Sequence, residues 1–159
     1  MSVFTARNRE CAAIHFSFGA LHNVVHAVAL LFEWRKRTMN FLIVEDNANM
    51  RRVMKSVVAE FAGETHECAD GAEAFAAYAA HLPDCVLMDI RMRKMDGISA
   101  TRQIKATYPK ANIIIVTEYD DTELRRSARD AGASDYVVKE NPLDVCRIIR
   151  GYARAGQSV

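Results

Sequence analysis

The chain has 159 residues, of which 50% are hydrophobic and 26% are charged, so it can bury one sizeable core and we expect one globular domain. Lysine and arginine total 21 against 20 aspartates and glutamates, which leaves a net charge of +1. This balance gives no electrostatic reason to expect a nucleic-acid polymer as the main partner.

Residues 1–38 are predicted to form an N-terminal extension, helical or poorly ordered, that the fold does not need. Within it, residues 11–32 contain no Asp, Glu, Lys or Arg and are long enough to span a bilayer. Histidine, asparagine and serine side chains dilute their hydrophobicity, and no cleavage site follows, so we expect neither a membrane segment nor a signal peptide. The four cysteines are scattered without metal-ligand spacing, which is typical of reduced thiols in a cytoplasmic protein.

From Asn40 onward, short apolar runs alternate with amphipathic stretches, which is the pattern of repeated βα units on a parallel sheet. Three of the runs are almost continuously aliphatic, as expected for strands that helices cover on both faces. The predicted fold class is therefore α/β, with five strands and five helices in a domain over residues 39–159. The expected strands cover residues 41–44, 66–68 with the neighbouring residues, 85–88, 113–116 and 136–138.

Apolar residues at helical spacing predict four of the intervening helices. Gly132 is placed to end the fourth helix in a left-handed conformation, while Asn141 and Pro142 are placed to cap and begin the last one. The residues of the four apolar stripes are Met50, Val53, Met54, Val57 and Phe61; Phe75 and Ala79; Leu124, Ala128 and Ala131; and Val145, Ile148, Ile149 and Tyr152.

Polar residues interrupt the apolar runs at the carboxyl ends of four predicted strands. In an open parallel sheet, ligands bind at this edge, and right-handed crossovers let residues from separate strands converge there. Taken singly, each residue has an ordinary explanation as a turn, cap or solvated charge, but their joint occurrence indicates one pocket. The residues are Glu45 and Asp46, Asp89, Thr117 and Lys139.

Three converging carboxylates repel one another unless a cation intervenes, and an all-oxygen site suits Mg²⁺ better than zinc. A carboxylate beside Mg²⁺ can attack a phosphoryl donor to form an acyl phosphate, and Asp89 on the central strand is the best candidate. Glu45 and Asp46 are then expected to hold the metal. Lys139 neutralises charge on the transferring oxygens, and the Thr117 hydroxyl donates a hydrogen bond to the product.

Over residues 40–155 the chain resembles the receiver domains of two-component response regulators. This resemblance implies a flavodoxin-like, doubly wound sheet with strand order 2-1-3-4-5. It also implies that Asp89 is the phosphoacceptor, that Mg²⁺ is bound by Glu45, Asp46, Asp89 and the backbone carbonyl of Arg91, and that Thr117 and Tyr136 are the switch pair. The shared motifs are FLIVEDN at 41–47, VLMDIRM at 86–92, MDG at 95–97, IIIVT at 113–117 and GASDYVVK at 132–139.

Phosphorylation is expected to draw Thr117 inward and leave space into which the Tyr136 ring rotates, which changes the outer face of the last two helices and the last strand. Five arginines off the apolar stripes decorate that surface, and they form either a partner-docking face or an ordinary solvated face. These are Arg125, Arg126, Arg129, Arg147 and Arg150.

Three positions depart from the usual family pattern. Arg93 stands where proline is common, so the loop after Asp89 is expected to be less rigid. Glu118 replaces a small residue after the switch threonine and places an anionic side chain near the pocket mouth. Glu140 follows Lys139 where the family usually has a cis proline, so a trans peptide bond is expected there.

We therefore expect a stand-alone receiver that acts as a phosphoacceptor switch rather than as a conventional enzyme. Its expected partners are a sensor histidine kinase or histidine phosphotransfer protein and a downstream protein target, without direct nucleic-acid or membrane binding; a homodimer stays open. One alternative is a Mg²⁺-dependent phosphatase with Asp89 as nucleophile, which lacks a second acid where Arg91 stands. The others are a flavodoxin-like nucleotide or flavin module, which lacks a glycine-rich phosphate loop, and a pseudo-receiver that is not phosphorylated.

Overall fold

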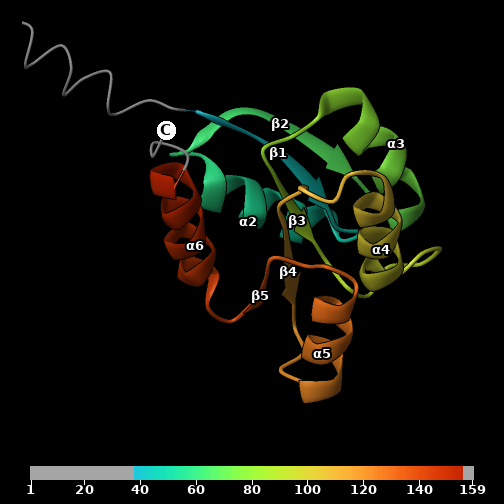
Figure 1. Ribbon diagram of the computed structural model, residues 1–159. Helices are drawn as coiled ribbons and strands as arrows, with labels where there is room; N and C mark the ends of the chain where they lie inside the picture. The colour runs from blue at the N-terminus through green and yellow to red at the C-terminus, as the bar shows by residue number, and fades with distance from the viewer. Residues whose placement is uncertain (1–37, 156–159) are drawn as a thin grey trace, which may run out of the picture. The chain divides into compact units, whose positions relative to one another are not determined.

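A computed structural model describes residues 38–155, and the predictions for the N-terminal extension, including residues 11–32, lie outside this range. Five parallel strands alternate with five helices and pair in the order β2-β1-β3-β4-β5, so the fold is the predicted flavodoxin-like α/β sheet (Figure 1). The elements are β1 (Met39–Val44), α2 (Ala48–Val58), β2 (Ala62–Cys68), α3 (Gly71–His81), β3 (Cys85–Met88), α4 (Gly97–Thr107), β4 (Ile113–Thr117), α5 (Thr122–Asp130), β5 (Asp135–Val138) and α6 (Pro142–Ala155).

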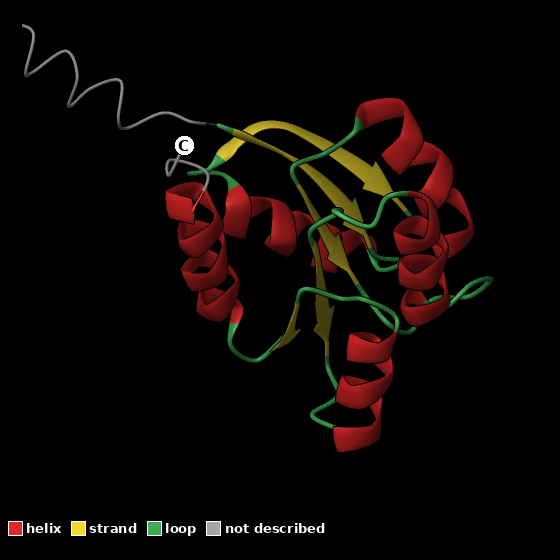
Figure 2. Cartoon of the chain, viewed as in Figure 1, coloured by secondary structure: helices red, strands yellow, loops and turns green. Residues whose placement is uncertain are grey.

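The sheet separates two apolar clusters because successive strand side chains point to opposite faces. Leu42 and Val44 of β1 belong to the cluster covered by α3, α4 and α5, whereas Phe41 and Ile43 belong to the cluster covered by α2 and α6. Figure 2 shows these two helical layers on either side of the strands. Every residue of the central strands β1, β3 and β4 except Asn40 is buried. Each buried isoleucine or leucine side chain contributes about 1.5–3 kcal/mol through removal of apolar surface from water.

The ends of the helices follow the local sequence signals. Gly132 has a φ of +93°, the left-handed conformation predicted for it at the end of α5. Pro142 begins α6 as predicted, and the Asn141 backbone carbonyl accepts the Asp144 N–H at 3.0 Å. No cis peptide bond occurs in the described chain, so the bond between Lys139 and Glu140 is trans, as expected.

Three local expectations are wrong. The β2 strand begins at Ala62 rather than at His66, because this edge strand is polar and has no apolar run to mark its start. Val53 is 47% exposed. Val58 is the buried valine on the inner face of α2, because it lies one helical turn after the buried Met54. On α3, Tyr78 is buried and the neighbouring Ala79 is exposed.

Two further expectations concern the membrane and the cysteines. Among the described helices, none is both long and apolar enough to cross a bilayer. Cys68, Cys85 and Cys146 are all free and buried.

Candidate functional site

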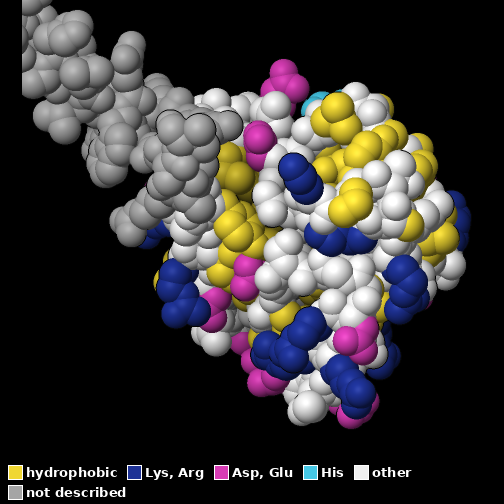
Figure 3. Space-filling model, in the orientation of Figure 1, with side chains coloured by type: hydrophobic (Ala, Val, Ile, Leu, Met, Phe, Trp, Pro, Cys, Tyr) yellow, Lys and Arg dark blue, Asp and Glu magenta, His cyan; other side chains and the backbone are white. Residues whose placement is uncertain are grey.

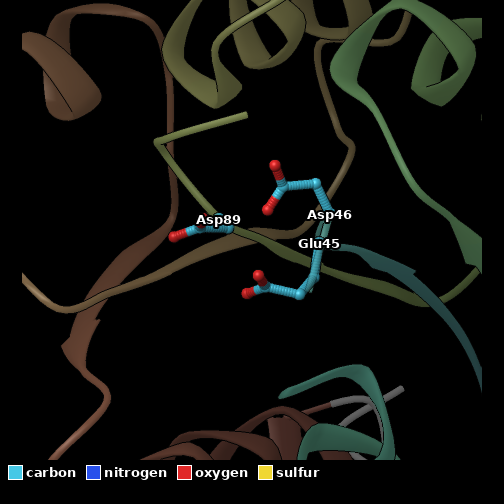
Figure 4. Close-up of side chains that lie close together, drawn as sticks. All are labelled: Glu45, Asp46 and Asp89. Carbon is cyan, nitrogen blue, oxygen red and sulfur yellow. The ribbon is translucent and has the colours of Figure 1, made fainter. Parts of the chain in front are cut away.

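The carboxyl ends of β1 and β3 bring three acids together. Glu45 and Asp46 follow β1, Asp89 follows β3, and the three side chains point toward a common space (Figure 4). One carboxylate oxygen from each residue lies within 4.8 Å of the other two. We call these three residues the acidic cluster. The parallel pairing of β1 with β3 produces this arrangement, because it aligns Val44 with Met88, the last residue of each strand.

Lys139, at the end of β5, reaches into the acidic cluster. Its Nζ lies 2.7 Å from Glu45 Oε2 and 3.1 Å from Asp89 Oδ1. The Lys139 backbone N–H donates to the Thr117 carbonyl at 2.7 Å, which ties the end of β5 to the end of β4. The structure therefore brings four of the five residues predicted at the strand ends into direct proximity, and the fifth, Thr117, lies on the adjacent strand.

Burial shifts the pKa values of the charged groups at this site. Asp89 is 4% exposed, and desolvation, followed by the charge of Glu45, raises its pKa to about 6 against the opposing effect of Lys139. Burial lowers the pKa of Lys139, but its contacts with Glu45 and Asp89 outweigh that effect and raise the pKa above its usual value. With both of these groups charged, one ammonium faces three carboxylates. The surplus negative charge and the all-oxygen donor set fit a hydrated divalent cation.

Thr117 is completely buried at the end of β4. Its Oγ1 has no hydrogen-bond partner within residues 38–155, so it does not bond the Asp89 carboxylate in this conformation. A buried hydroxyl without a partner destabilises a fold by about 1–3 kcal/mol. Such an atom is available to a hydrogen-bond acceptor that arrives with a ligand or a modification.

Tyr136 contacts the loop that follows Thr117. Its hydroxyl donates to the Tyr119 carbonyl at 2.6 Å, and the Arg125 guanidinium carbon lies 4.5 Å from the centroid of its ring. Desolvation raises the pKa of Tyr136, with Arg125 opposing it, so the hydroxyl stays protonated and able to donate. Tyr136 on β5 is therefore connected to Thr117 on β4 through this hydrogen bond and residues 117–119.

The pocket at the acidic cluster has a volume of about 140 Å³. Glu118 lines it, as expected from its position after the threonine, and the Arg91 guanidinium carbon stacks 4.2 Å from the centroid of the Tyr119 ring. Arg93 Nε lies 3.7 Å from Asp46 Oδ2. Sequence reasoning missed Tyr119, because no local pattern indicates that its ring meets a side chain from the loop after β3. It also missed Asn47 and Met50, which line the pocket.

Basic side chains gather over α5, interleaved with acidic ones (Figure 3). Four of the five arginines predicted on this surface form ion pairs with acids of the described chain. This pairing favours an ordinary solvated face over a strongly basic docking patch, since paired charges leave little net field. The pairs are Arg125–Asp120 at 2.8 Å, Arg126–Asp130 at 3.9 Å, Arg147–Asp144 at 3.1 Å and Arg150–Glu60 at 2.8 Å.

Comparison with known proteins agrees with this fold and pocket. The family model of the response regulator receiver domain matches residues 41–149. The chemotaxis protein CheY of Bacillus subtilis is 38% identical over 109 residues, which cover 68% of this chain and 89% of CheY. The regulatory protein AtoC of Escherichia coli is 39% identical over 108 residues, which are 68% of this chain but only 23% of AtoC.

Solved structures give the same result. A two-component response regulator of the LuxR family from Aurantimonas is 30% identical and superimposes with a TM-score of 0.69, covering 74% of this chain and 86% of that one. The fold and the acidic pocket define a receiver-type α/β domain. The chain belongs to the response regulator receiver family.

Proposed function

We propose that the protein is a phosphoacceptor switch that is transiently phosphorylated on Asp89. The observation that carries this proposal is the contact of one buried ammonium, Lys139 Nζ, with both Glu45 and Asp89 inside a cluster of three carboxylates. An ion pair alone would need one acid. Two additional acids around the same pocket create a surplus of negative charge that suits a metal-assisted phosphoryl transfer.

In the proposed reaction, an oxygen of the ionised Asp89 carboxylate attacks the phosphorus of a phosphohistidine. A P–O bond forms and the P–N bond breaks, with the electron pair leaving on the imidazole nitrogen. Lys139 neutralises charge on the transferred oxygens, and the Thr117 hydroxyl, which has no partner among residues 38–155, donates to one of them. Hydrolysis of the resulting acyl phosphate by water resets the switch.

The acidic cluster and the Arg91 backbone carbonyl would hold Mg²⁺ in this scheme. When bound, the cation neutralises the charge that gathers during phosphoryl transfer. The CheX–CheY complex of Borrelia burgdorferi supports this part of the proposal, because that CheY was solved with BeF₃ and Mg²⁺. It is 28% identical to this chain, with a TM-score of 0.66.

Membership of the family supports the proposed partners. The phosphoryl donor is a sensor histidine kinase or a histidine phosphotransfer protein, and the phosphorylated form binds a downstream protein target in the cytoplasm. Thr117 and Tyr136 transmit the change: an acceptor oxygen on Asp89 attracts the Thr117 hydroxyl, and the segment that carries the Tyr119 carbonyl moves with it. That the protein acts as a stand-alone receiver, without an output domain, stays a prediction.

Intact-mass measurement after incubation with acetyl phosphate and Mg²⁺ tests the proposal. One added phosphoryl group is expected, and Asp89→Asn or removal of the metal should abolish it. The control is Asp84→Asn, which alters an exposed acid at the opposite end of β3 and should leave the modification intact. A mass increase that persists in Asp89→Asn contradicts the assignment, and no increase in the wild-type protein favours a receiver that is not phosphorylated.

A further inference from the structure

The loop of residues 90–96, which follows β3, is held by a buried carboxylate from another part of the chain. Asp70 caps α3, where its Oδ1 accepts the Ala72 N–H at 2.9 Å. The same carboxylate accepts two more backbone N–H groups, from Lys94 to Oδ2 at 2.9 Å and from Met95 to Oδ1 at 3.2 Å. These donors lie 24 and 25 residues further along the chain, so Asp70 joins a helix cap to a tertiary contact.

The aspartates that cap α4 and α5 make no comparable contact within the described residues. Asp96 accepts hydrogen bonds from Ser99, and Asp121 accepts one from Leu124, so each bonds only its own helix. Asp70 differs also in being 4% exposed. Its pKa is lowered, above all by the hydrogen bond from the α3 backbone and further by the two bonds from the loop, against the opposing effect of burial.

Close packing leaves the loop little room to shift. A Cβ on Gly71 would lie 2.5 Å from the Met95 carbonyl oxygen, and one on Gly97 would lie 1.9 Å from the Asp89 carbonyl oxygen. The Gly97 N–H donates to the Ile90 carbonyl at 2.9 Å, which closes the two ends of the loop on each other. The loop is therefore held at its two ends by the hydrogen bond between Gly97 and Ile90, and at residues 94 and 95 by the Asp70 carboxylate.

The residue types of the loop do not by themselves restrain its backbone in this way. Arg93 stands where a proline ring would fix the backbone, and its side chain is 87% exposed. Arg91, whose carbonyl is the proposed metal ligand, lies in the same loop. We propose that Asp70 is a positioning residue which, by holding the Lys94 and Met95 N–H groups, orients the Arg91 carbonyl toward the acidic cluster. This inference rests on the proposed metal site.

Asp70→Asn in the full chain tests the role. The asparagine keeps Oδ1, which can still cap α3, but its Nδ2 faces the Lys94 N–H and cannot accept it. The matched control is Asp121→Asn, which removes the charge of a cap that bonds α5 alone. The measurements are backbone amide hydrogen exchange at residues 94 and 95 and the Kd for Mg²⁺, obtained by NMR titration with magnesium chloride.

Asp70→Asn is expected to speed exchange above all at the Lys94 amide, which loses its acceptor, and less at the Met95 amide, whose acceptor Oδ1 remains. It is also expected to weaken Mg²⁺ binding by roughly tenfold, a typical effect of removing a group that orients a metal ligand. Asp121→Asn should retain both properties. Unchanged Mg²⁺ affinity in Asp70→Asn overturns the positioning role alone, as does an equal loss in Asp121→Asn. Absence of Mg²⁺ binding by the wild-type protein overturns the proposed metal site and the positioning role together. If Asp70→Asn does not fold, Asp70→Ser, whose hydroxyl can cap α3 but is one bond shorter, serves for the same comparison.

Discussion

Replacing Asp89 with asparagine removes one carboxylate from a crowded buried cluster while keeping the size of the side chain. Burial, followed by the charge of Glu45, raises the Asp89 pKa from its usual 3.8 to about 6. The folded protein therefore binds this proton more tightly than the unfolded chain does, so the ionised carboxylate destabilises the fold. We expect Asp89→Asn to be more stable than the wild-type protein at neutral pH without metal.

The rise of the pKa from 3.8 to about 6 corresponds to about 3 kcal/mol in the free energy of unfolding. At neutral pH, where Asp89 is ionised, the free energy of unfolding of the wild-type protein is lower by the whole of this amount. As the pH falls through the window between these two values, Asp89 becomes protonated in the folded protein and the deficit disappears. Near neutral pH the difference amounts to on the order of 10 °C in Tm for a domain of this size.

Urea denaturation in the presence of a chelator, at pH about 7 and about 4, measures the difference between the two proteins. Added Mg²⁺ should stabilise the wild-type protein and leave Asp89→Asn almost unchanged. Asp130→Asn is the control, because its side chain is 67% exposed, and it should stay within about 0.5 kcal/mol of the wild type. Equal stability of wild type and Asp89→Asn at neutral pH, or an advantage of the variant that persists at pH about 4, would refute the reasoning.

Three further predictions test other contacts. Lys139→Met removes the ammonium 3.1 Å from Asp89 Oδ1, and phosphorylation by acetyl phosphate should slow by about tenfold or more in intact-mass time courses; an unchanged rate would argue against its role. Gly97→Ala places a Cβ 1.9 Å from a backbone carbonyl oxygen and should lose about 2–4 kcal/mol in urea denaturation. Gly151→Ala, whose Cβ would meet no atom of residues 38–155 within 4 Å apart from its chain neighbours and its own helix backbone, should gain up to about 1 kcal/mol, so similar losses in both would contradict the packing. Tyr136→Phe loses a 2.6 Å hydrogen bond and should cost about 0.5–1.5 kcal/mol. Amide NMR signals of residues 118–121 should move with it, and unchanged signals would show that the hydroxyl does not hold this loop.

Much of the candidate site could be predicted because strand ends are marked in the sequence itself. Glu45 and Asp89 each follow a run of apolar residues that the structure buries completely, and Lys139 follows a shorter apolar run that is only partly buried. The carboxyl ends of parallel strands share one edge, so these positions predict a common pocket without knowledge of any contact. The β2 strand was underestimated for the complementary reason. Its exposed residues, including Glu64 and Glu67, carry no apolar run that could mark an edge strand.

The sequence by itself determined the α/β class, the positions of most strands and the residue types at their ends, because each of these depends on local periodicity and local burial. Only the tertiary structure decided that Lys139 contacts Glu45 and Asp89 together, and that Asp70 binds a loop 24 residues away. Such contacts depend on how distant segments pack, and the desolvation that raises the pKa of Asp89 exists only after they have packed.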